Sequence, residues 1–200
     1  HCPVLEKKAK TCMNCPVCHI VSGWGGAGSA SDGKLTLTTG FGGNLEEYIG
    51  EIRLENMIRR VDETFVSYGV DNHAYEPEGT IVKETIRKAA SVGIKVLPAR
   101  IRHIGTDASR VVLNNMYLDL KEKCDILLET VVRDLIIEEG KARGIVLKDG
   151  TRYYAEHVIV APGREGASWL ETIVNRLQLN IASMPVDIGV RVEVPDSVCE

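Results

Sequence analysis

A glycine-rich run near the start of the chain constrains the fold more than any other part of the sequence. The stretch from Gly23 to Leu35 reads GWGGAGSASDGKL, so that five of its thirteen residues are glycine. A backbone without β-carbons adopts left-handed conformations freely and can lie directly against a flat or anionic ligand. The composition of this run therefore predicts a loop that contacts a ligand.

The run also contains the spacing G-x-G-x-x-G, through Gly23, Gly25 and Gly28. In dinucleotide-binding βαβ units this spacing follows a strand, opens a helix and precedes an acidic strand end by about twenty residues. Here the next residues, 29–43, hold four further glycines and a threonine run, which disfavours a helix. We therefore interpret the run as a ligand-contacting loop outside a βαβ unit, with a flexible surface loop as the alternative.

The overall composition is that of a globular protein with one or two domains. The chain of 200 residues is long enough to bury a core, and its net charge of −4 does not favour nucleic acid as a partner. No apolar stretch approaches the roughly 18 residues of a transmembrane helix, so no membrane contact is expected. The first residues, HCPVLEKKAK, lack both an initiating methionine and the apolar core of an export signal. We therefore expect a cytoplasmic protein and an internal piece of a longer polypeptide.

Hydrophobic periodicity and turn residues predict a mixture of helices and strands. Helices are expected at 45–48, 52–68, 80–92, 106–123 and 168–177, and strands at 94–97, 126–128, 131–138, 142–147, 151–154, 157–160 and 186–194. Asn44 and Thr106 are the expected N-caps of two of these helices. The Lys148-Asp149-Gly150 sequence predicts a hairpin turn, so the strands around it should form an antiparallel meander.

Four of the six cysteines lie within the first eighteen residues, and they are candidate metal ligands: Cys2, Cys12, Cys15 and Cys18. Four thiolates suffice for a closed tetrahedral zinc site or for an iron–sulfur cluster. A redox-active pair formed by Cys15 and Cys18 and a set of unliganded thiols are the alternatives. The CPVCH sequence also spells a haem attachment motif, which is disfavoured because attachment takes place outside the cytoplasm.

Two histidines fall in predicted loops and are candidates for catalysis. Imidazoles exchange protons near neutral pH, so His73 or His103 could act as a general acid or base. A structural role is the alternative for both, and the sequence identifies no other catalytic residue.

Several motifs, taken together, resemble those of one enzyme family. Residues 138–163, EEGKARGIVLKDGTRYYAEHVIVAPG, look like the strand–turn–strand insert of flavoproteins with two dinucleotide-binding domains. The glycine-rich run is similar to the hallmark of bacterial and archaeal FAD-dependent dehydrogenases. The sequences HIGTD at 103–107, APGREG at 161–166 (with Trp169) and DIGVRVE at 187–193 fit the same group, in the expected order.

This resemblance implies an α/β protein with a partial FAD/NAD(P)-binding-type fold, a β-meander and an inserted helical region. It divides the chain into a Cys- and Gly-rich cofactor-contacting segment (1–43), a helical substrate or cap-like region (44–123), the meander with its return to the FAD domain (124–166), and a substrate-side helix and strand (167–200). The implied reaction is hydride transfer between an unknown small-molecule substrate and the flavin. The implied partner is the rest of the parent polypeptide.

The glycine-rich run supplies most of the expected cofactor contacts. Its backbone amides would approach the flavin edge or the pyrophosphate, its serine and aspartate the ribityl hydroxyls, and its lysine the N1 side of the ring. A simple turn at Asp32 and Gly33, with Lys34 in solvent, is the alternative for these three residues. The contact residues expected in this run are Gly25, Gly26, Ala27, Gly28, Ser31, Asp32, Gly33 and Lys34.

The meander and the segment after it supply the remaining expected contacts. By resemblance, Val132, with Val131 as the alternative, lies beside the adenine in the first meander strand, and the turn at Ala161 and Gly163 returns to the cofactor. Arg164 would meet a phosphate or an acidic substrate, with a surface position as the alternative.

The chain departs from the family in one respect. The family begins with a strand, a true glycine-rich turn and a second strand that hold the ADP part of FAD, and this chain does not contain them. We therefore expect the chain alone to bind FAD weakly or not at all, because the pyrophosphate would lack its helix N-terminus, and to be inactive. The rival hypothesis is a non-catalytic binding module that is stapled by zinc or an iron–sulfur cluster at its N-terminal cysteines.

Overall fold

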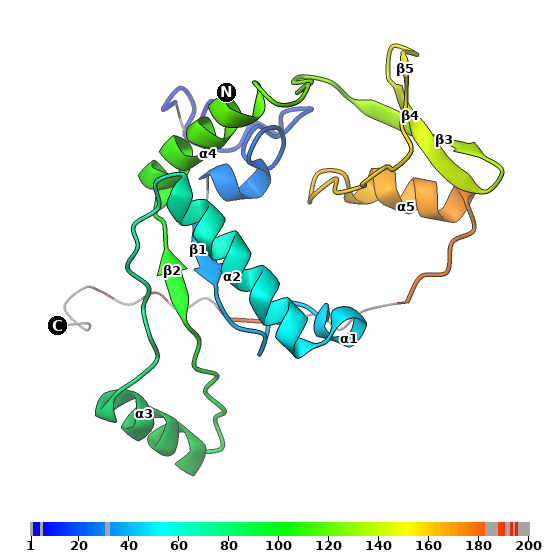
Figure 1. Ribbon diagram of the computed structural model, residues 1–200. Helices are drawn as coiled ribbons and strands as arrows, with labels where there is room; N and C mark the ends of the chain where they lie inside the picture. The colour runs from blue at the N-terminus through cyan, green and yellow to red at the C-terminus, as the bar shows by residue number, and fades with distance from the viewer. Residues whose placement is uncertain are drawn as a thin grey trace.

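Helices and two small antiparallel sheets make up the part of the chain that the computed structural model describes, which is residues 2–4, 6–30, 33–182, 188–190, 193 and 195 (Figure 1). The fold is therefore mixed α/β. In chain order its elements are η1 (Gly26–Ala30), β1 (Lys34–Thr36), α1 (Glu46–Ile49), α2 (Glu51–Ser67), α3 (Thr80–Ser91), β2 (Ile101–His103), α4 (Thr106–Leu120), β3 (Val132–Glu138), β4 (Lys141–Leu147), β5 (Arg152–Tyr154) and α5 (Ala167–Arg176).

The first sheet anchors the end of the glycine-rich run. Strand β1 pairs antiparallel with β2, and Leu35 lies opposite Arg102. Two further backbone bonds extend the ladder, from Leu37 N–H to the Arg100 carbonyl at 2.9 Å and from Ile104 N–H to the Gly33 carbonyl at 2.8 Å. The run is therefore fixed at its C-terminal end by a strand that lies far along the chain.

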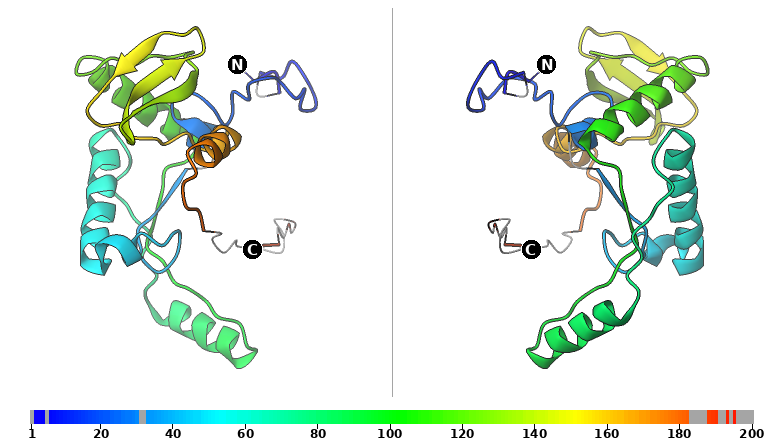
Figure 2. Two further views of the ribbon diagram at one scale, coloured as in Figure 1. Left: turned by 90° about the vertical axis from the view of Figure 1, so that its right-hand side faces the viewer. Right: turned by 90° about the vertical axis from the view of Figure 1, so that its left-hand side faces the viewer.

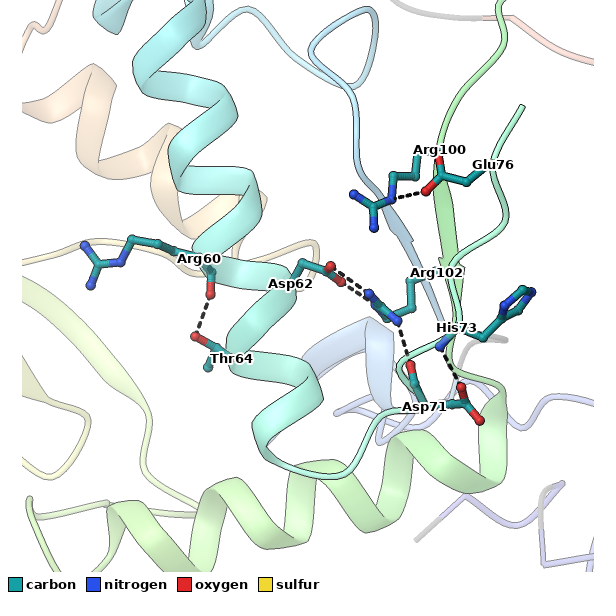
Figure 3. A network of polar contacts seen from close by, with 8 residues as sticks. All are labelled: Arg60, Asp62, Thr64, Asp71, His73, Glu76, Arg100 and Arg102. Carbon is teal, nitrogen blue, oxygen red and sulfur yellow. Dashed lines mark hydrogen bonds and ion pairs between the residues drawn. The ribbon is translucent and has the colours of Figure 1, made fainter. Parts of the chain in front are cut away.

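A buried ion pair fixes β2 to helix α2. The guanidinium of Arg102 donates two hydrogen bonds to the carboxylate of Asp62, one of them at 2.8 Å, and a third to the Asp71 carbonyl at 2.6 Å (Figure 3). Only 2% of Arg102 and 8% of Asp62 is exposed. Because both charges are buried, each depends on the other for the interactions it lost with water.

Helix α4 holds the beginning of the glycine-rich run. The indole N–H of Trp24 donates to the Leu113 carbonyl at 2.8 Å, and its ring meets that of Tyr117 edge-on at 5.6 Å between centroids. At Gly25, with φ of +82°, a β-carbon would lie 2.5 Å from Leu113 Cδ1. The run therefore lies between two anchors, α4 at one end and β2 at the other.

The second sheet is the predicted meander, with strand order β3-β4-β5 and antiparallel pairing throughout. Helix α5 lies close to this sheet on one side of the molecule (Figures 1 and 2). The indole N–H of Trp169 donates to the Arg133 carbonyl at 2.9 Å, and Arg176 forms an ion pair with Asp134. Ile173, on the same helix, is buried.

The five predicted helices and the meander are confirmed, but three expected strands are wrong. Residues 94–97, 126–128 and 157–160 have no strand partner in the described part of the chain. The expected caps are also wrong, because Leu45 and Gly105 stand at the N-cap positions in place of Asn44 and Thr106. The expected strand at 186–194 falls mostly outside the described residues.

The molecule exposes far more surface than a compact protein of its mass. Its accessible area is 16210 Å², whereas a compact monomer of 21.9 kDa would expose about 9,300 Å². Helix α3 stands at the tip of an arm, away from the other elements (Figures 1 and 2). None of the helices in the described ranges is long and apolar enough to cross a bilayer. The buried apolar residues among those described are Val70, Val112, Ile136, Val146, Leu147 and Ile173.

Replacement of Arg102 with methionine should lower the free energy of unfolding by about 3–5 kcal/mol, because it leaves the Asp62 carboxylate buried without a counter-ion. Urea unfolding followed by circular dichroism measures the change. The double variant Asp62→Leu/Arg102→Met removes both charges and should recover most of the loss. A single variant as stable as the wild type would contradict this account of the pair.

The ion pair should also make stability depend on acid pH. Its hydrogen bonds to Arg102 hold the pKa of the Asp62 carboxyl below its ordinary value, although burial opposes this. The stabilisation is therefore present above about pH 4, the pKa of an unfolded aspartate, and is lost as the pH falls through the lower folded-state pKa. Urea midpoints measured across this range should fall more steeply for the wild type than for Asp62→Asn, and parallel curves would argue against it.

Candidate functional site

A cavity of about 860 Å³ lies where the glycine-rich run, the meander and the segment after the meander meet. Its walls come from residues 21–23, 26–27, 130–132 and 158–166, together with Val17, Leu135, Ile145 and Trp169. A volume of several hundred cubic ångströms and a mostly apolar lining are typical of sites for small molecules and cofactors. This cavity is the candidate site.

Main chain without side chains forms one part of the wall. Gly23 and Gly26 have φ of +84° and +52°, and a β-carbon added at either would meet no atom within 4 Å. Gly163 has φ of +65° and the same free space. These three glycines form a cradle of main chain without side chains. A planar or anionic group can approach such a backbone more closely than it could approach a residue with a side chain.

The meander and α5 form an apolar wall. Val132 begins β3 and lies opposite Leu147, and Leu135 and Ile145 are partners two steps further along the ladder. The regular pairing shifts between Val132 and Asp134. Trp169 completes this side of the cavity, held by its bond to the Arg133 carbonyl.

The segment that follows the meander lines the cavity without belonging to a sheet. Within the described residues, the main chain of 157–162 makes no backbone hydrogen bond, and Ile159 is 92% exposed. An apolar segment whose backbone groups are unpaired is costly to leave in this state, and its free N–H and C=O groups are available to a partner strand. Arg164 and Glu165, which are both exposed, bring a positive and a negative charge to the same wall.

The structure brings six of the predicted cofactor-contact residues to this one cavity. They come from three distant parts of the chain and are Gly26, Ala27, Val132, Ala161, Gly163 and Arg164.

Other predicted contact residues lie elsewhere. Gly25 packs on Leu113, and a β-carbon at Gly33 would lie 2.5 Å from the Ser109 hydroxyl, so both glycines serve close packing. Gly28 lies in η1 and Lys34 in β1, and neither lines the cavity. Ser31 and Asp32 are outside the described residues.

Neither candidate histidine lines the cavity. The backbone N–H of His73 donates to the Asp71 carboxylate at 2.6 Å, and its ring meets that of Tyr75 edge-on at 4.9 Å between centroids. His103 lies in β2 opposite Lys34. A catalytic role for either one stays a prediction without a contact to the candidate site.

The N-terminal cysteines do not form a cluster. Cys12 and Cys15 are exposed, Cys2 and Cys18 are half-buried, and all four are free thiols. Across the described residues, no three His, Cys, Asp or Glu side chains are arranged so that they could hold a metal ion. Zinc or an iron–sulfur cluster therefore stays a prediction that this arrangement does not support.

Sequence reasoning assigned no site role to several wall residues. Trp169 is the clearest case, and the signal for it was available: it stands one helical turn before Ile173, the buried residue of α5. An aromatic residue on the buried face of a helix next to the meander is expected near the surface that the meander covers.

Comparison with known proteins gives no further identification, because no protein-family model and no curated protein sequence matches this chain.

Glycines that serve packing should respond to substitution differently from glycines in open space. Gly33→Ala should lower the free energy of unfolding by at least about 1 kcal/mol, since Gly33 has φ of +60° and lies against Ser109. Gly28→Ala is the matched control, because Gly28 has free space and no positive φ. Urea unfolding of both variants tests this placement, and equal effects would show it to be wrong.

Proposed function

We propose that this chain is the cofactor-contacting part of an FAD-dependent oxidoreductase, and that its cavity receives part of the flavin dinucleotide. The supporting observation is the composition of the cavity wall. The motif resemblance assigned the glycine-rich run, the first meander strand and the Ala161–Arg164 turn to the cofactor, and all three contribute to one cavity of suitable size.

The residues present fit such a group. The backbone cradle at Gly23 and Gly26 accommodates a planar ring or a phosphate, and Val132 and Leu135 offer an apolar surface to an aromatic ring. The guanidinium of Arg164 has the donor geometry that pairs with phosphate or carboxylate oxygens. When bound, FAD would supply hydride transfer at its flavin ring, while the protein binds, orients and desolvates the reactants.

The exposed surface supports the further proposal that the rest of a longer polypeptide packs on this chain. The accessible area exceeds that of a compact monomer by about 6,900 Å², which is more than one partner covers in even a large dimer interface. The unpaired segment 157–162 lines the cavity, so a strand paired with it would complete that wall. The glycine-rich run contains η1, a 3-10 turn of five residues, and is followed by β1, so it does not open the long helix whose N-terminus holds a pyrophosphate.

The proposal predicts that the complete polypeptide retains flavin and that Ala27→Leu weakens binding. Ala27 lines the cavity and has no positive φ, so leucine there fills space without straining the backbone. We expect the dissociation constant for FAD to rise at least about tenfold, equal to about 1.4 kcal/mol. Absorbance near 450 nm and the quantity of FAD released on denaturation measure the effect.

The matched control is Ala90→Leu, the same substitution on the exposed face of α3 and away from the cavity. It should leave the FAD content unchanged. Equal retention by the two variants would contradict the proposed position of the cofactor. A complete polypeptide that holds no flavin but a stoichiometric amount of zinc or iron would favour the non-catalytic metal-stapled module instead.

A further inference from the structure

Two cysteines flank a residue of the cavity wall. Cys15 and Cys18 are separated by Pro16 and Val17, and Val17 lines the cavity. The chain bends at both intervening residues. A disulfide needs Cα atoms about 4.4–6.8 Å apart, and a β-turn over two intervening residues brings the first and fourth Cα atoms to less than about 7 Å, so a two-residue spacing is short enough for the link.

Hydrogen bonds attach the second cysteine to the cavity. The carbonyl of Cys18 accepts the hydroxyl of Ser22 at 2.8 Å and the backbone N–H groups of Ser22 and Val21 at 3.0 and 3.1 Å. Val21 and Ser22 both line the cavity. Any change of conformation at Cys18 therefore acts directly on the cavity wall.

The two thiols differ in exposure, and thiol–disulfide exchange commonly pairs an accessible attacking thiol with a less accessible resolving thiol. Cys15 is exposed and Cys18 half-buried, and both are free. Cys12 is engaged within its own loop, where its sulfur accepts the backbone N–H of Asn14 at 3.5 Å and donates to the side-chain oxygen of Asn14 at 3.6 Å. The exposed thiol is open to attack and exchange, and the half-buried thiol stands ready to resolve the product.

We propose that Cys15 and Cys18 are a redox-active dithiol at the rim of the cavity, and that its oxidising partner is a small disulfide of the glutathione type. The Cys15 thiolate attacks one sulfur of the disulfide, which forms a mixed disulfide and releases one thiolate. The Cys18 thiolate then attacks the Cys15 sulfur, which closes the intramolecular disulfide and releases the second thiolate. Two protons pass from the cysteines to the two released thiolates, so the dithiol loses two electrons and the small disulfide gains them.

Closure of this disulfide places Pro16 and Val17 in a short covalent ring. Val17 then has a fixed position in the cavity wall, so the redox state of the pair and the binding of a ligand that touches Val17 are coupled reciprocally. The pair itself needs neither flavin nor metal, and its test is independent of the proposed function.

The test equilibrates the whole chain in a series of reduced and oxidised glutathione ratios, quenches it with acid and labels the free thiols. Mass spectrometry with peptide fragmentation then locates each label. We expect Cys15 and Cys18 to lose their labels together, in a single two-electron transition, with a link between them. In Cys15→Ser, the remaining Cys18 should lose its label only as a mixed disulfide with glutathione.

The control is Cys124→Ser, which removes an exposed thiol that follows α4, and it should leave the midpoint of the transition unchanged. Independent labelling of Cys15 and Cys18 at every glutathione ratio would overturn the proposal. A link of either one to Cys12 would overturn it as well, as would stoichiometric zinc in the purified chain that is released only when these thiols are modified.

Discussion

The ion pair between Arg102 and Asp62 is the interaction on which the arrangement of the first half of the molecule depends. Arg102 lies in β2, Asp62 lies in α2, and the Asp71 carbonyl ties in the loop between α2 and α3. Strand β2 pairs with β1, and β1 contains the end of the glycine-rich run. Loss of this ion pair would therefore displace β2 and β1, and with them the glycine-rich loop that lines the cavity.

The loop is held at both ends and left bare in the middle. Trp24 and Gly25 pack on α4, and Gly33 packs between Ile104 and Ser109. Between these anchors Gly26 and Ala27 turn toward the cavity. Two attachments with a short 3-10 turn of small residues between them preorganise a binding loop without filling the space that a ligand needs.

The molecule owes little of its stability to a central core. Apart from Val70, which follows α2, and Val112 in α4, the buried apolar residues among those described belong to the meander and α5. The cavity lies between the glycine-rich run and the meander, so a ligand there would contact both and stabilise their relative position. The large exposed area and the arm that ends in α3 motivate the proposal that further polypeptide packs on this chain.

How far the sequence predicts this structure depends on how local each determinant is. Helix α2 and the hairpin at Asp149 and Gly150 were predictable, because a 3.6-residue stripe and a turn sequence are local signals. Residues 157–160 have the composition of a strand but no partner among the described residues, and a strand exists only when it is paired.

The candidate site also has some features that local sequence predicts and others that depend on residues far away in the chain. The absence of β-carbons predicted that the glycine-rich run would contact a ligand, and Gly26 fits this role by its free space. The separate role of Gly25 and Gly33 was not predictable, because it is set by Leu113 and Ser109, which are remote in the sequence. The gathering of Val132 and Arg164 at one cavity is a matter of tertiary structure, which only the family resemblance anticipated.

Hydrogen–deuterium exchange of the complete polypeptide, with and without FAD, tests the central claim most directly, because it reports on each backbone amide separately. The account predicts slower exchange on FAD addition in residues 23–28 and in 158–164 together, and no change in α3. Protection that is confined to other segments, or no protection in either of these two, would contradict it.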